Sequence, residues 1–133
     1  MPFATGDIFQ YELSTDGSHY TIIGTSYKNN PVLIIPSTYN DIPVTHIADC
    51  AFINNKAETI IISNNIIEIG AEAFAGCAEL QTLVIGESVK NFHKGCFNEC
   101  HNLKTIYYNA IAANNCNTSG NEPWYFKNVG MNL

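Results

Sequence analysis

The sequence repeats itself in AEAFAGCAELQTLVI, residues 71–85, and KGCFNECHNLKTIYY, residues 94–108. When the second stretch is laid on the first, Phe74 meets Phe97 at an offset of 23 residues. The same offset relates Cys77 to Cys100, Leu80 to Leu103 and Leu83 to Ile106. Internal repeats of about 20 to 50 residues are typical of solenoids, in which each unit packs on the next.

A third copy of the pattern precedes these two and is centred on Phe52. A small residue stands just before each phenylalanine, apolar residues stand five and eight positions before it, and an alternating apolar pair follows it. These positions are Ala51, Ala73 and Cys96; Ile47, Ile69 and Phe92; Val44, Ile66 and Val89; and the pairs Ile60–Ile62, Leu83–Ile85 and Ile106–Tyr108. The first unit is longer, with the insertion STYNDIPV at residues 37–44, which we expect to bulge out as a loop.

This periodicity predicts a solenoid of stacked units that combine short strands with helical turns. Each unit supplies one short strand with alternating inward residues, followed by a helical turn around GAEAF (70–74) or HKGCF (93–97). One unit cannot bury its apolar side alone, whereas stacked units cover one another. The strands are therefore expected to form a parallel sheet along one face, with isoleucine, leucine and phenylalanine in ladders along the axis.

The repeats resemble the BspA-like class of leucine-rich repeats. The segments that carry this resemblance are LIIPSTYNDIPVTHIADCAF (33–52), IIISNNIIEIGAEAFAGCAEL (60–80) and LVIGESVKNFHKGCFNECHNL (83–103). Single positions depart from the family pattern, with Gly86 in place of proline, His93 in place of glycine and Ala57 in place of leucine. The resemblance covers residues 31–109 and implies an α/β leucine-rich-repeat-like right-handed solenoid. It also implies adhesion or protein–protein contact by a bacterial surface protein, outside the cell or at its surface.

The composition excludes several classes of function. The net charge is -6 and all six basic residues are lysines, so the chain lacks the basic surface that nucleic acid binding needs. With 46% hydrophobic and 14% charged residues the chain is too apolar to be disordered, and its apolar runs are too short to span a membrane. The N-terminal residues MPFATGDIFQ do not have the pattern of a signal peptide.

The two ends differ from the repeats. Residues 1–30 are expected to form a capping domain, because alternating apolar residues on both sides of TDGS predict a β-hairpin within residues 7–24. Residues 110–133 are expected to be irregular and to lead toward a further repeat of a longer protein. Trp124, Tyr125 and Phe126 are expected to fold back over the last repeat or to form a binding spot. An open strand edge at this end would allow self-association.

The sequence predicts no catalytic residues, no metal site and no cofactor. The four histidines have no metal-binding spacing, no pair of cysteines has the C-x-x-C spacing, and no glycine loop that could hold a phosphate is present. Cys77 and Cys100 occupy one repeat position and are expected to stack as free thiols, while Cys96 fills a slot for a small residue. The states of Cys50 and Cys116 are left open.

The outward positions of the strands form the candidate partner-binding face. One column contains threonines, and the next is apolar from Ile34 to Tyr107. The candidate binding residues are Ile34, Thr59, Ile61, Thr82, Val84, Thr105 and Tyr107. β-Branched residues suit strands whatever the function, but a continuous uncharged stripe is also typical of a contact surface.

We therefore expect a non-catalytic protein-binding or adhesion module whose partner is a host or neighbouring-cell surface protein. Two alternatives stay open. The first is a structural spacer of a larger surface protein, and the second is a carbohydrate-binding accessory module. Tyr107 is the only aromatic residue among the candidate binding residues, which gives little support to sugar binding.

Overall fold

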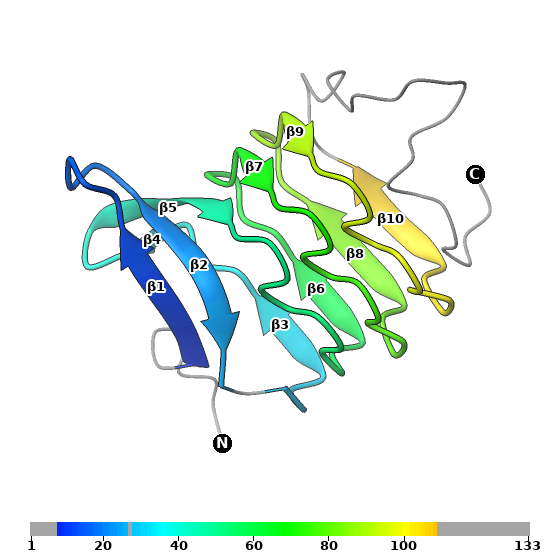
Figure 1. Ribbon diagram of the computed structural model, residues 1–133. Helices are drawn as coiled ribbons and strands as arrows, with labels where there is room; N and C mark the ends of the chain where they lie inside the picture. The colour runs from blue at the N-terminus through cyan, green and yellow to red at the C-terminus, as the bar shows by residue number, and fades with distance from the viewer. Residues whose placement is uncertain (1–7, 27, 109–133) are drawn as a thin grey trace.

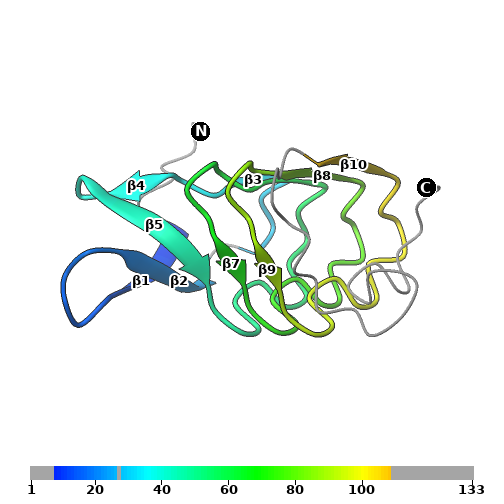
Figure 2. The same ribbon diagram turned by 90° about the horizontal axis from the view of Figure 1, so that it is seen from above.

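The computed structural model describes residues 8–26 and 28–108, and within them the chain winds into a β-solenoid (Figure 1). Each coil contributes strands to two sheets, which lie on opposite sides of the coils in Figure 2. Sheet B consists of four parallel strands in the order β3-β6-β8-β10. Their bounds are Val32–Ile34, Thr59–Ile61, Thr82–Ile85 and Thr105–Tyr108.

Sheet A forms the second side, and of its strands the sequence analysis predicted only the two of the N-terminal hairpin. It follows the order β1-β2-β5-β7-β9, in which β2, β5, β7 and β9 pair in parallel. These strands are β1 (Phe9–Leu13), β2 (Tyr20–Thr25), β5 (Ile42–Ile47), β7 (Glu68–Ile69) and β9 (Asn91–Phe92). The apolar residues five and eight positions before each phenylalanine were the available signal for the other strands, but the two-residue strands β7 and β9 are too short to show period-two alternation.

The expected helical turns around the phenylalanines are not helices, which corrects the α/β description. The N–H groups of Cys50, Phe52 and Asn54 donate to carbonyls of the next coil, at Ala71, Ala73 and Ala75. Backbone groups that bond to a neighbouring coil are unavailable for i→i−4 bonds within their own segment. Left-handed residues also stand two positions before and after each phenylalanine, and they break a helix. These residues are Cys50, Asn54, Glu72, Gly76, Gly95 and Glu99.

The long first unit contains a hairpin instead of a simple loop. Strand β4 (Thr38–Tyr39) pairs with β5 in an antiparallel register. The two residues between them, Asn40 and Asp41, have φ values of 51° and 64°. Positive φ at both central positions is the geometry of a type I′ turn, which asparagine and aspartate tolerate. The extra residues of STYNDIPV therefore form a β-hairpin at one end of the solenoid.

The core lies between the two sheets and is built from the predicted ladders. Phe52, Phe74 and Phe97 stack with ring centroids 5.2 and 5.5 Å apart and nearly parallel planes. Ala51, Ala73 and Cys96, the small residues that precede them, are all buried. The inward strand residues Leu33, Ile60 and Leu83 are in register and have no solvent exposure. The ladder pattern that the repeat predicts is confirmed.

The predicted N-terminal β-hairpin is present and lies on the first coil. Strands β1 and β2 pair antiparallel, and β2 joins sheet A beside β5. Phe9 is buried and meets Phe52 edge to face at 5.9 Å, so the hairpin covers the N-terminal end of the phenylalanine column. Tyr11 stacks on Tyr39 at 3.9 Å, and burial raises the pKa of its hydroxyl to about 12. Residues 109–133, including Trp124, Tyr125, Phe126 and the predicted open end, lie outside the described residues.

Candidate functional site

The outward face of sheet B brings the seven candidate binding residues together. The strand register aligns Val32, Thr59, Thr82 and Thr105 in one column and Ile34, Ile61, Val84 and Tyr107 in the next. The apolar column has two exposed ends, because Ile34 is 40% exposed and Tyr107 57%. Its two central members, Ile61 and Val84, are half-buried. We call these four residues the apolar column.

The face is also free of charge. None of the eight residues in the two columns carries an ionisable acid or base at neutral pH. Two of the five large hydrophobic residues that are exposed in the described part of the chain, Ile34 and Tyr107, belong to the apolar column. A row of apolar side chains that crosses four strands provides a flat surface for an extended contact.

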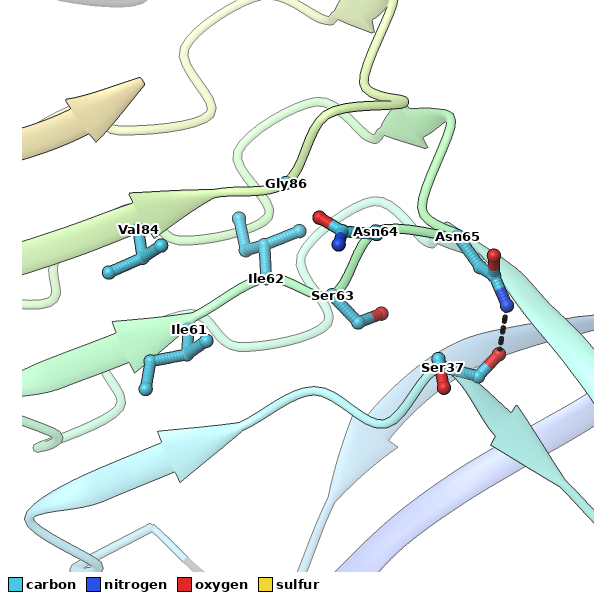
Figure 3. A pocket seen from close by; sticks show the side chains of 8 residues that line it. All are labelled: Ser37, Ile61, Ile62, Ser63, Asn64, Asn65, Val84 and Gly86. Carbon is cyan, nitrogen blue, oxygen red and sulfur yellow. Dashed lines mark hydrogen bonds between the residues drawn. The ribbon is translucent and has the colours of Figure 1, made fainter. Parts of the chain in front are cut away.

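A shallow groove continues the apolar column beyond the ends of β6 and β8 (Figure 3). Its volume is about 460 Å³, and Ile61 and Val84 form its apolar side. Its polar side is a turn, where Ser63, Asn64 and Asn65 come two to four residues after the end of β6. The groove was missed at the sequence level, because residues from three coils contribute to it and only the stacking shows that they meet.

Each polar side chain of this turn makes one hydrogen bond to another coil. The Asn64 Oδ1 accepts from the Glu87 N–H at 3.1 Å, and the Asn65 Nδ2 donates to the Ser37 carbonyl at 2.9 Å. The Ser63 hydroxyl donates to the Pro36 carbonyl at 3.1 Å. These bonds hold the three side chains in fixed orientations at the rim of the groove.

The outward face of sheet A differs from sheet B along β5, β7 and β9, although Leu13 on β1 and Ile23 on β2 are exposed there. His46, Glu68 and Asn91 lie side by side in register, and His93 follows at the end of β9. The Glu68 carboxylate bonds to both histidines, with one oxygen 3.3 Å from the His46 Nε2 and the other in a short hydrogen bond with the His93 Nε2. Burial lowers the pKa of His46, Glu68 raises it, and the nearby His19 lowers it further. The shared repeat position of His46, Glu68 and Asn91 was a signal that the sequence analysis did not use.

The buried cysteines form a structural ladder. The Cys77 thiol donates to the Phe52 carbonyl at 3.3 Å, and the Cys100 thiol donates to the Phe74 carbonyl at 3.2 Å. Contact with Cys100, together with burial, raises the pKa of the Cys77 thiol. Cys77 and Cys100 are buried free thiols, as predicted, Cys96 is buried in its slot for a small residue, and Cys50 is a free thiol on the surface. The two stacked thiols donate hydrogen bonds to turn carbonyls of the preceding coil. A nucleophilic thiol would need access to solvent, which these two buried thiols do not have.

Two kinds of feature are absent from residues 8–26 and 28–108. No group of three or more histidine, cysteine or acidic side chains is arranged there to hold a metal ion. In the same residues no helix is long and apolar enough to cross a membrane.

Solved structures with the same fold come from bacterial leucine-rich repeat proteins. A leucine-rich repeat protein from Bacteroides capillosus superposes with a TM-score of 0.71 at 22% identity, and the match covers 96% of both chains. The T. pallidum leucine-rich repeat protein TpLRR gives a TM-score of 0.71 at 23% identity, over 76% of this chain and 48% of that one. A leucine-rich cell surface protein from Faecalibacterium prausnitzii gives 0.65 at 26% identity, over 81% of this chain and 32% of that one.

These matches show which features the chain shares with known proteins. The similarity to the Bacteroides and T. pallidum proteins shows the fold alone, and the chain spans about half the length of TpLRR. No curated protein matches the chain. The BspA type leucine-rich repeat region, a family model of six copies, matches residues 26–129, which is most of the sequence. The chain therefore belongs to the BspA-type leucine-rich repeat family.

Proposed function

We propose that this chain is a non-catalytic protein-binding or adhesion module that holds its partner on the outward face of sheet B. The observation that carries the proposal is the uncharged face itself, with the apolar column Ile34, Ile61, Val84 and Tyr107 in register across four strands. The threonine column beside it supplies hydroxyl groups for hydrogen bonds. Together the candidate binding residues are Ile34, Thr59, Ile61, Thr82, Val84, Thr105 and Tyr107.

Strand propensity alone does not account for this face. Sheet A has the same parallel geometry and the same core beneath it, yet its outward row contains His46, Glu68 and Asn91. Strands of this solenoid therefore tolerate polar and titratable side chains on their outer side. The lack of charge on sheet B therefore has a cause other than strand geometry. It is expected on a face where a bound partner removes water from the side chains, because burying a charge is costly.

The family context supports a place at the bacterial cell surface. BspA-type repeats are the matched family, and one structural neighbour is described as a leucine-rich cell surface protein. A module at that location meets proteins of a host or of neighbouring cells. The partner we propose is one of these proteins.

A binding comparison tests the proposal. The wild-type chain and the double variant Ile61→Lys/Val84→Lys are applied to an array of matrix proteins and glycans. The matched control is His46→Lys/Asn91→Lys, which adds two lysines to sheet A on either side of Glu68. Circular dichroism verifies that all three are folded. We expect the sheet B variant to lose protein binding and the sheet A variant to keep it.

Three results would overturn the proposal. Equal binding by all three proteins would place the contact away from sheet B. No binding by any of them would favour the spacer function, in which the repeats only separate other parts of a surface protein. Binding to glycans alone would favour the carbohydrate-binding alternative.

A further inference from the structure

The groove beyond the ends of β6 and β8 is continuous with the apolar column. Ile61 and Val84 belong to both, so a chain lying on the apolar column reaches the polar turn without crossing a gap. Gly86 follows β8 and has no side chain, and a Cβ at that position would lie 2.3 Å from the Ser63 carbonyl oxygen. The groove therefore has an apolar side and a polar end built from neutral groups.

The hydrogen bonds of this turn show which side-chain amide atoms of Asn64 and Asn65 remain available to a ligand. The partner of Asn64 is an N–H group, so the bonded atom is its oxygen and its Nδ2 is left with two donors. The partner of Asn65 is a carbonyl, so the bonded atom is its nitrogen and its Oδ1 is left as an acceptor. Among the residues that the structure describes, no hydrogen bond uses either of these remaining atoms. Asn64 is exposed, and Figure 3 shows its carboxamide directed toward the side of the groove where Gly86 lies.

We propose that this groove binds an extended, uncharged peptide segment of the protein partner through hydrogen bonds to its main chain. The inference rests on the proposed function and names the part of the partner that the face holds. The Asn64 Nδ2 donates to a main-chain carbonyl of the peptide, and the Asn65 Oδ1 and the Ser63 hydroxyl oxygen provide acceptors for its N–H groups. Apolar side chains of the same segment lie on Ile61 and Val84.

The chemistry of the groove favours a peptide over other ligands. An extended peptide presents one donor and one acceptor per residue and places every second side chain on the same side. That pattern matches neutral donors and acceptors beside an apolar surface. A charged ligand would find no ionic partner among the lining residues, and a sugar would find no aromatic ring there to stack on.

The experiment uses a phage-displayed library of random twelve-residue peptides as the probe. Peptides selected on the wild-type chain are synthesised, and their dissociation constants are measured by calorimetry. We expect enriched sequences to be uncharged and rich in β-branched residues. In Asn64→Asp the Oδ1 keeps its bond from the Glu87 N–H while the Nδ2 donor becomes an acceptor, so we expect the dissociation constant to rise about tenfold.

The control variant is Gln81→Glu, which adds the same charge at an exposed position just before β8, at the opposite end of that strand. It should bind the peptides as the wild type does. A second readout does not depend on the fold of a variant. Peptides methylated on single main-chain nitrogens should lose affinity at the one or two positions that face Asn65 and Ser63.

The outcomes separate this inference from the proposed function. Ile61→Lys/Val84→Lys could fail to bind the peptides while Asn64→Asp binds them as the wild type does. In that case sheet B is the binding face, but the inference that the groove hydrogen-bonds to the peptide main chain is wrong. If no peptide is enriched, or only charged ones are, the inference is also overturned, while the array result still decides the function. Selective binding of array glycans in place of peptides would overturn both.

Discussion

Sheet A and sheet B share one core but present different surfaces. The inward residues of both are fully apolar, with Ile47, Ile69 and Phe92 from sheet A facing the ladder of sheet B. On the outside, sheet A carries a histidine–glutamate cluster that links neighbouring coils. Sheet B carries threonines and the apolar column.

The difference shows which properties the solenoid requires and which it leaves free. Stacking requires the inward ladders, because each coil must bury the apolar side of the next. It places no such demand on the outward residues, which include a histidine–glutamate cluster on sheet A and are uncharged in the two columns of sheet B. A neutral outer face that stacking does not require is the reason to look for function on sheet B.

The largest expected effect comes from breaking the core that both sheets share. Phe74→Ala should lower the free energy of unfolding by about 3–5 kcal/mol, because it removes the central ring between Phe52 and Phe97 and leaves a cavity. Urea denaturation followed by circular dichroism measures this loss. Thr82→Ala, on the outer face of sheet B, is the comparison and should cost about 1 kcal/mol or less. Similar losses for the two variants would mean that the phenylalanine column is not central to stability.

An intermediate effect is expected at the glycine that follows a strand in each sheet. A Cβ on Gly86, after β8, would lie 2.3 Å from the Ser63 carbonyl oxygen, and one on Gly70, after β7, 2.5 Å from the Asp49 nitrogen. Backbone atoms cannot move aside easily, so Gly86→Ala and Gly70→Ala should each cost about 1–3 kcal/mol. Thermal or urea unfolding measures both.

The control for these variants is Gly24→Ala. The close contact of its Cβ would be with the end of the flexible Gln10 side chain, at 2.9 Å, while the Ala51 carbonyl oxygen lies at an ordinary 3.9 Å, so the loss should be small. The two sheets should differ in one respect. Gly86→Ala should also weaken peptide binding, because Gly86 lines the groove, whereas Gly70→Ala should not. Equal binding by both variants would contradict the location of the groove site.

The smallest effect concerns the pH dependence of sheet A. Burial lowers the pKa of His46, so below about pH 6.5 the unfolded chain takes up a proton that the folded chain resists. This contribution to stability is present above that pH and is lost as the pH falls. Glu68 on the neighbouring strand β7 raises this pKa, and His19 beside the ring lowers it.

The test compares unfolding free energies at pH 7.5 and pH 5.5. The decrease between the two should be smaller in His46→Gln than in the wild type. His101→Gln is the control, because His101 pairs with Glu99 in a well-exposed position away from sheet A. An unchanged or larger decrease in His46→Gln would show that Glu68 dominates at this site. On sheet B the same comparison has no counterpart, since its two outward columns have no titrating group near neutral pH.

Much of the fold could be predicted from the repeat. The offset of 23 between Phe74 and Phe97 predicted their stacking, and the alternation around Ile60 and Leu83 predicted which strand residues point inward. The helical turns could not be judged correctly. A sequence window around Phe74 suits a helical turn, but the N–H of Phe74 bonds to Cys96 of the next coil, and a contact between coils is invisible in a local window.

The candidate site was predictable to the same extent. The columns of sheet B follow from strand alternation, so Ile61 and Val84 could be placed beside each other from the repeat alone. The groove could not, because its polar end depends on how the turn after β6 packs against Ser37 and Glu87 in other coils.

By itself the sequence determined the repeat, the inward ladders and the absence of charge from one outward face. These properties depend on residue spacing, and spacing along a strand fixes which way a side chain points. Only the tertiary structure decided that each coil has a second strand, that the turns bond to the next coil, and that Asn64 and Asn65 meet the apolar column. These features depend on contacts between residues more than twenty positions apart, and their geometry is set when the coils stack.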